Sequence, residues 1–369
     1  MSPYSREDPL LMIPGPTPLS PGVRAALAAP LRSHTSAENA ASLARIREGL
    51  RRITGMSGAD VFVLPGSGTL AMEAAVVNHV RVGERVVIVN HGYFADRFVD
   101  ICTTHGLDVD DVRAQWGRRA SLDEVRAVVE RGAPPALVIV THVDTSTGVR
   151  ADVAGVAAMA RDAGAVVLLD GVCSTAGVRE DLDDLGVDLL VTAPQKALAA
   201  PPGLALVLCS PRARERRKAL SPPAAYYLDL SRWEAPMTST AYFATHATSL
   251  VRALDVSVAE IFAEGLDERF RRHLEVAQLA REGFRELQFT PLTEEAALAP
   301  TLSVLAPPAG VDEARLRQDL LADGVLVAPG IGAFAGKAIR VGHMGAAAQA
   351  EVMLVLDAVR RATARQTAA

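Results

Sequence analysis

Three segments of the chain could do chemistry, and each directly follows a short apolar run. The segment Pro65-Gly-Ser-Gly-Thr69 lets backbone N–H groups converge at the start of a helix, where they form an anion site. Asp170 supplies a carboxylate, and Lys196 supplies an amine whose apolar neighbours favour a desolvated, neutral form. Taken singly, each also fits an ordinary structural role: a tight turn, a helix cap and a surface lysine.

The glycine-rich segment departs from two nucleotide-binding motifs. No Lys-Ser/Thr pair follows it at Walker A spacing, and Ala71 stands where GxGxxG needs its third glycine. The next apolar run ends at Asn90 and not at an acid that could bind a ribose. These departures argue against a nicotinamide-binding oxidoreductase, which is the alternative from a different class of enzyme.

Taken together, the three groups match the requirements of pyridoxal 5'-phosphate (PLP). Its phosphate needs a helix start, its ring nitrogen an anionic partner and its aldehyde a lysine. The 26 positions from Asp170 to Lys196 leave room for one crossover between neighbouring strands. No metal site is expected, because the eight histidines lack paired spacing and the three cysteines are far apart.

Local motifs from Ile13 to Gly345 resemble those of the class V (fold type I) PLP-dependent aminotransferases, in the alanine–glyoxylate/serine–pyruvate branch. The matching segments are Ile13-Pro-Gly-Pro-Thr17, Pro65-Gly-Ser-Gly-Thr69, Thr141-His-Val-Asp-Thr-Ser-Thr-Gly148, Leu169-Asp-Gly-Val172, Gln195-Lys-Ala-Leu198, Ala200-Pro-Pro-Gly203 and Ile339-Arg-Val-Gly-His-Met-Gly345. The resemblance implies a fold type I transferase, aminotransferase activity and PLP as cofactor.

The resemblance also implies a role for each residue of a cofactor site. Lys196 would form a Schiff base with PLP, and Asp170 would pair with the pyridine nitrogen. Phe94 would stack on the ring, and Thr145 would hydrogen-bond the phenolic oxygen. The phosphate would be held by Gly68, Thr69 and Gln195.

Three further residues match the family's substrate and subunit contacts. Arg340 matches the arginine that grips the substrate carboxylate, a task suited to a planar guanidinium. Tyr242 and Thr245 match a Y-x-x-T motif that reaches the phosphate of the neighbouring subunit. The resemblance therefore implies a homodimer whose sites are completed by the partner chain.

The chain departs from the family pattern at four places. Asp144 replaces a glutamate, and Pro194 replaces the serine before Gln-Lys. The segments 32–36 and 246–248 also differ, and we expect them near the substrate entrance. These departures weaken any transfer of substrate identity from the family.

The pattern of apolar runs predicts an α/β fold with a mostly parallel sheet sandwiched by helices. The predicted strands are Val61–Leu64, Val86–Val89, Ala136–Val140, Ala165–Leu169, Asp188–Val191 and Leu204–Cys209. Gly55 should end the helix that precedes the first strand, and Ser121 with Glu124 predicts a capping box. We expect an N-terminal arm over 1–20, a large PLP-binding domain over 21–264 and a smaller α+β domain over 265–369.

Composition narrows the class of protein further. The formal charge of −5, with no basic block, argues against nucleic-acid binding. No window of 20 apolar residues and no signal peptide is found, so we expect no membrane span and a cytoplasmic location. The sequence thus predicts a homodimeric aminotransferase moving an amino group from an alanine- or serine-type donor to glyoxylate or pyruvate. The nearest alternatives are S-ureidoglycine–glyoxylate or 2-aminoethylphosphonate–pyruvate transamination, or a lyase reaction, on the same site.

Overall fold

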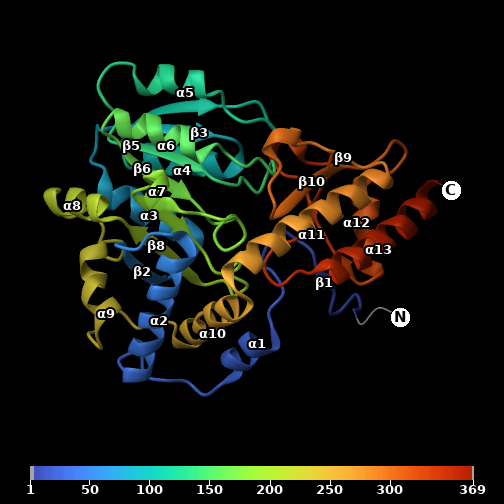
Figure 1. Cartoon of the computed structure of the whole chain (residues 1–369), viewed down its shortest axis with the longest axis horizontal. Helices are drawn as coiled ribbons and strands as arrows, with labels where there is room; N and C mark the ends of the chain where they lie inside the picture. Colours follow the sequence, from blue (N-terminus) through green and yellow to red (C-terminus); the bar gives the residue numbers. More distant parts are fainter. Residues whose placement is uncertain (1–3, 368–369) are drawn as a thin grey trace.

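The computed structural model describes residues 4–367 and has two lobes (Figure 1). The larger lobe is built around a sheet of seven strands within this part of the chain. Its strands are β2 (Asp60–Pro65), β3 (Arg85–Asn90), β4 (Asp108–Arg113), β5 (Leu137–Thr141), β6 (Val166–Asp170), β7 (Leu189–Thr192) and β8 (Leu204–Cys209). The six predicted strands are all present, each within one residue of its expected ends.

The sheet is mostly parallel, in the order β2-β8-β7-β6-β5-β3-β4. Strands β3 to β7 run parallel, and β5 and β6 are buried along their whole length, which explains their continuous apolar sequences. The exception is β8, which lies antiparallel to both of its neighbours although its continuous apolar sequence resembles that of the parallel strands. It also missed β4, because this edge strand, Asp-Val-Asp-Asp-Val-Arg, is polar and largely exposed.

Helices cover both faces of this sheet. The chain crosses the sheet in one direction through α3 and α4 and returns through α5, α6 and α7, so right-handed crossovers place the two groups on opposite faces. The helices of this lobe are α1 (Pro21–Ala28), α2 (Ala37–Thr54), α3 (Gly68–His79), α4 (Tyr93–Thr104), α5 (Leu122–Val129), α6 (Val153–Asp162), α7 (Leu182–Leu185), α8 (Pro211–Ala219), α9 (Glu234–Thr238) and α10 (Thr248–Glu264), with a 3-10 turn over Leu230–Trp233.

Two helix ends tested the expected capping signals. Gly55 ends α2 in the left-handed region, with φ 68° and its N–H bonded to the Arg51 carbonyl, as predicted. The predicted capping box at the start of α5 is not formed. Ser121 does occupy the N-cap position, but its side chain makes no capping hydrogen bond. The helix therefore starts where expected without the predicted side-chain contact.

The smaller lobe combines antiparallel strands with three helices. The four-stranded sheet runs β12-β13-β10-β9, and a separate pair joins β1 to β11. These elements are β9 (Thr290–Pro291), β10 (Leu302–Ala306), β12 (Ala328–Pro329), β13 (Ile339–Gly342), β1 (Leu10–Leu11), β11 (Val325–Leu326), α11 (Leu266–Glu286), α12 (Glu313–Ala322) and α13 (Gln349–Thr367), with 3-10 turns over Glu295–Ala297 and Gly332–Phe334.

The N-terminal arm is attached to the smaller lobe. Leu10 and Met12 are buried in the apolar core that α11, α12 and α13 form with β10 and β13, and β1 pairs in parallel with β11. The domain boundaries at 20 and 264 stay predictions, and residues 1–3 and 368–369 lie outside the described chain.

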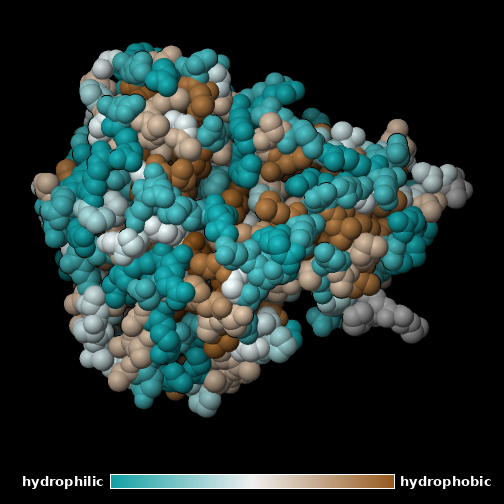
Figure 2. Space-filling view, in the orientation of Figure 1, coloured by the Kyte–Doolittle hydropathy of each residue, from teal (hydrophilic) through white to brown (hydrophobic). Residues whose placement is uncertain are grey.

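The surface of the molecule is largely hydrophilic on the face shown in Figure 2, with hydrophobic residues in small scattered groups, several of them in the crease between the lobes. Among the described residues, none of the helices combines the length and the apolar character that crossing a bilayer requires.

Candidate active site

The predicted catalytic groups meet at the carboxyl-terminal edge of the parallel strands. Asp170 is the last residue of β6, with Thr141 of β5 and Val191 of β7 as its register partners. Lys196 follows β7 after a short loop, and the glycine-rich segment follows β2. Open α/β sheets bind ligands at this edge, so the fold gathers the three groups that the sequence singled out.

The start of α3 has the free groups that an anion needs. Ser67 occupies the N-cap but makes no side-chain capping bond, and within residues 4–367 no partner accepts from the backbone N–H of Gly68 or Thr69. The side-chain oxygen Oε1 of the nearby Gln195 is buried and likewise lacks a partner within the described chain. The unpaired N–H groups of Gly68 and Thr69 fit the phosphate of PLP, which accepts hydrogen bonds, whereas Oε1 of Gln195 is itself an acceptor and only the Nε2 of that amide could donate to the phosphate.

The Asp170 carboxyl group is almost completely buried. Burial raises its pKa to about 7, a hydrogen bond from the Val172 N–H lowers it, and the Asp144 carboxylate raises it. The charges of Arg97 and Lys196 favour the ionised form. The distance from the Val172 nitrogen to Oδ1 is 3.0 Å. A protonated pyridine nitrogen would give this carboxylate the counter-charge that its burial calls for.

Lys196 is half-buried, and desolvation lowers the pKa of its amine, while the neighbouring Cys173 thiolate would raise it and Arg340 lowers it. Its Nζ donates to the Pro14 carbonyl of the N-terminal arm, and its own carbonyl accepts from Thr17 Oγ1 at 3.0 Å. Gly15 has φ 101°, and a Cβ there would lie 2.5 Å from the Lys196 Cδ. The arm therefore fits closely over the lysine only because residue 15 is glycine.

The helix turn that carries Phe94 is hydrogen-bonded to the residues on either side of Thr145, Asp144 and Ser146. Asp144 Oδ2 accepts from the Phe94 N–H at 3.1 Å, and Ser146 Oγ accepts from the Tyr93 N–H at 3.0 Å. These bonds hold the first turn of α4 against the segment that carries Thr145. The sequence analysis did not predict this link, although it noted that Asp144 stands where the family has a glutamate.

Arg340 brings the smaller lobe to the same site. It lies on β13, donates through Nε to the Pro329 carbonyl at 2.7 Å, and donates through Nη1 to the Thr145 carbonyl at 3.2 Å. Burial lowers the pKa of this guanidinium, while the Cys173 and Asp144 charges raise it. The contact with Thr145 places a cation between the lobes, where a substrate carboxylate could reach it.

Tyr242 and Thr245 are exposed, and within residues 4–367 no contact joins either to the groups around Lys196. The Tyr242 ring instead lies 5.2 Å from that of His34. Nearby, Thr248 Oγ1 donates to the Arg32 carbonyl at 3.3 Å, so the two segments that depart from the family pattern touch each other.

Two residues near the site were missed by the sequence analysis. Cys173 is buried with its Sγ 4.0 Å from Thr301 Oγ1, and its charge state acts on both Lys196 and Arg340. Arg97 lies three residues after Phe94 on α4, which puts both on the same helix face. That spacing was the available signal for Arg97.

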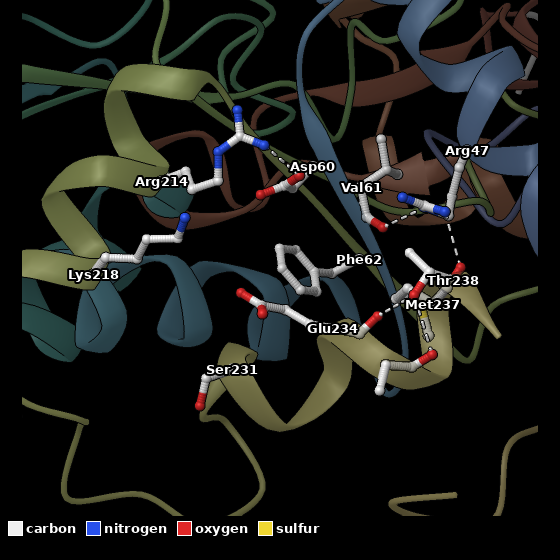
Figure 3. A pocket seen from close by; sticks show the side chains of 11 residues that line it. Arg47, Asp60, Val61, Phe62, Arg214, Lys218, Ser231, Glu234, Met237 and Thr238 are labelled. Carbon is white, nitrogen blue, oxygen red and sulfur yellow. Dashed lines mark hydrogen bonds and ion pairs between the residues drawn. The ribbon is translucent and has the colours of Figure 1, made fainter. Parts of the chain in front are cut away.

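A separate cavity of about 520 Å³ lies at the amino-terminal end of β2, away from these groups (Figure 3). Its charged side chains already have partners: Arg214 pairs with Asp60 at 3.0 Å, and Arg47 donates to the carbonyls of Val61 and Met237. Glu234 pairs with Arg217, and Lys218 pairs with Glu215. None of the described residues that line this cavity has a buried side-chain atom without a hydrogen-bond partner, in contrast to Gln195 at the sheet edge.

Comparisons with known proteins identify the family of the chain. The family model described as aminotransferase class V matches residues 25–358. The chain is 34% identical to alanine–glyoxylate aminotransferase 1 of Saccharomyces cerevisiae, covering 92% of each chain. It is 32% identical to the L-aspartate–glyoxylate aminotransferase of Paracoccus denitrificans, covering 91% of this chain and 86% of that protein. The solved alanine–glyoxylate aminotransferase of a Nostoc species superposes with a TM-score of 0.91 at 31% identity, covering 98% of this chain and 96% of that one.

Proposed function

The chain belongs to the class V aminotransferases, which use PLP, and we propose that it moves the amino group of an alanine- or serine-type amino acid to glyoxylate or pyruvate. The two relatives and the solved structure described above differ in their named amino donor but share glyoxylate as acceptor. Glyoxylate is therefore the better supported half of the proposal, and the donor rests on the branch that the sequence motifs resemble.

One arrangement carries the proposal. A half-buried lysine, a buried carboxylate and the free N–H groups of a helix start lie at one edge of the sheet, with Arg340 reaching them from the smaller lobe. When bound, PLP supplies an aldehyde that takes up the amino group and a ring that withdraws electrons from the substrate.

Each residue then has a defined task. Gly68, Thr69 and Gln195 would hold the phosphate, Phe94 would stack against the ring, Thr145 would donate to its phenolic oxygen, and Asp170 would hold the ring nitrogen protonated. Arg340 would orient the substrate by its carboxylate through the N–H groups that do not bond to Pro329 and Thr145.

Lys196 has two tasks in this proposal. It would hold the cofactor between turnovers, and its free amine would take the proton from the substrate Cα and return it to the cofactor carbon that receives the amino group. Burial favours the neutral amine, which a base must be before it accepts a proton. The Pro14 carbonyl, which now accepts from Nζ, would keep the amine near this position.

We also propose a homodimer in the cytoplasm. The exposure of Tyr242 and Thr245 supports the dimer, because both match residues that act across a subunit boundary and, within residues 4–367, neither contacts the groups around Lys196. Mixing the Tyr242→Phe and Lys196→Ala chains tests this idea. If each site combines Lys196 of one chain with Tyr242 of the other, the mixed dimer has one intact site, and its activity should differ from the average of the two variant dimers.

The amino transfer is tested by separate half-reactions of the holoenzyme. Alanine, serine and aspartate are each added without an acceptor, and the loss of the cofactor's visible absorbance is followed. Glyoxylate and pyruvate are then added to the aminated enzyme. Rapid reaction with alanine or serine and recovery with glyoxylate support the proposal.

Three results would point elsewhere. Reaction with S-ureidoglycine or 2-aminoethylphosphonate alone would favour those transaminations. Product formation from one substrate without any acceptor would favour a lyase. A cofactor-loaded enzyme that no amino acid bleaches would end the aminotransferase proposal.

A further inference from the structure

Arg97 is a half-buried cation without an acidic partner in the described part of the chain. The structure pairs many arginines of residues 4–367 with carboxylates, but none lies within ion-pair distance of Arg97. The one hydrogen bond that the structure gives its side chain runs from Nη1 to Thr69 Oγ1, over 2.9 Å. A guanidinium has five N–H donors, so most of its capacity is left for another acceptor.

The surroundings of Arg97 belong to the cofactor site. Its bond to Thr69 reaches the first turn of α3, where the backbone N–H groups lack partners. Its guanidinium carbon lies 5.0 Å from the centre of the Phe94 ring, and its charge acts on Asp170. The cation thus contacts Thr69 and the Phe94 ring directly, and it acts on Asp170 through its charge.

The position of Arg97 is fixed by the way α4 begins. Asp144 and Ser146 bond the N–H groups of Phe94 and Tyr93, which anchors the first turn of the helix. Gly92 is tightly enclosed there, since a Cβ would lie 2.3 Å from Ser146 Oγ. Arg97 comes one turn after Phe94, so the anchored turn aims both side chains at the same place.

The hydrogen bond from Arg97 also determines which role the Thr69 hydroxyl group can take towards a ligand. Because Thr69 Oγ1 accepts from Arg97, its own hydrogen stays free to donate to a second group. A phosphate at the start of α3 would then meet two backbone N–H groups, a hydroxyl hydrogen and a nearby cation. These are the groups that bind phosphate dianions strongly.

We propose that Arg97 is a cofactor-binding residue that supplies the positive charge for the phosphate of PLP and ties the phosphate loop to the Phe94 ring. The inference rests on the proposed function, since it requires PLP at the sheet edge. Under this proposal α4 binds the phosphate through Arg97, together with the loop before α3.

The test compares ligands with and without the phosphate. Full-length protein freed of cofactor is titrated with PLP and with pyridoxal, and binding is followed by absorbance. The Arg97→Gln variant should bind PLP about 10- to 100-fold more weakly, as expected for one charge-assisted contact, and pyridoxal within about 2-fold of wild type. Inorganic phosphate should compete with PLP on wild type more effectively than on the variant.

Two further variants keep the result interpretable. Arg97→Lys retains the charge and should recover part of the PLP affinity even if Arg97→Gln folds poorly. Arg52→Gln removes the same charge from α2, where the guanidinium lies 4.2 Å from the Phe262 ring centre, and should bind both ligands like wild type. Equal weakening of PLP and pyridoxal, or no weakening of either, would overturn the inference. Failure of wild type itself to bind PLP would instead contradict the proposed function.

Discussion

Replacing Arg340 by lysine changes hydrogen-bond geometry without changing charge. The guanidinium of Arg340 bonds the carbonyls of Pro329 and Thr145 and still has N–H groups free for a carboxylate. A lysine ammonium has three donors on a flexible stem and cannot hold both carbonyls and a two-point carboxylate contact together. The loss of one charge-assisted contact should cost about 1.5–3 kcal/mol, or about 10- to 150-fold in kcat/KM.

Half-reaction kinetics of the Arg340→Lys holoenzyme measure this loss. Amination by the donor and deamination by glyoxylate should both slow if both carboxylates use Arg340. The cofactor spectrum without substrate should match wild type. The matched control is Arg285→Lys, because Arg285 bonds Glu295 on the surface of the smaller lobe, 2.6 Å away. Wild-type kcat/KM for both half-reactions would refute the assignment of Arg340, and a loss confined to glyoxylate would indicate a donor without an α-carboxylate.

Two other changes test neighbouring parts of the site. For the protein without cofactor, Asp170 should make stability fall as pH rises from about 4 to about 7, because burial raises the folded-state pKa to about 7 and the folded state therefore binds the proton more tightly. The change in the free energy of unfolding is at most about 4 kcal/mol, and Asp170→Asn should remove it. Urea unfolding at several pH values measures it, and an equal pH dependence of the free energy of unfolding in both proteins would contradict the prediction. Gly15→Ala puts a Cβ 2.5 Å from Lys196 Cδ at φ 101° and should lower the free energy of unfolding by about 1–3 kcal/mol and loosen the arm over the lysine. Its control is Gly83→Ala, where φ is 80° and nothing lies within 4 Å, so an equal loss in both variants would show that backbone strain alone is responsible.

The sequence predicted the parts of the fold that depend on local pattern. Continuous apolar runs marked six strands because buried parallel strands need apolar residues on both faces. The direction of β8 was not predictable in this way, since a buried antiparallel strand has the same composition. The polar edge strand β4 was missed because only one of its sides is paired within the sheet.

The candidate site was predictable residue by residue but not in its contacts. Lys196, Asp170 and the glycine-rich loop each follow a strand, and strand ends meet at one edge of a sheet. The bond from Phe94 to Asp144 spans 50 positions and depends on how α4 packs. Arg97 lacked any signal beyond its spacing from Phe94, because a missing ion pair is visible only in three dimensions.

The most direct test of the account is to find the residue that carries the cofactor. The purified holoenzyme is reduced with borohydride, digested and analysed by mass spectrometry, with Lys337 as an exposed lysine in the same digest. The account predicts a phosphopyridoxyl group on the peptide that contains Lys196, and none in the Lys196→Ala chain. A phosphopyridoxyl group on another lysine, or none on Lys196 in enzyme that transfers amino groups, would contradict the account.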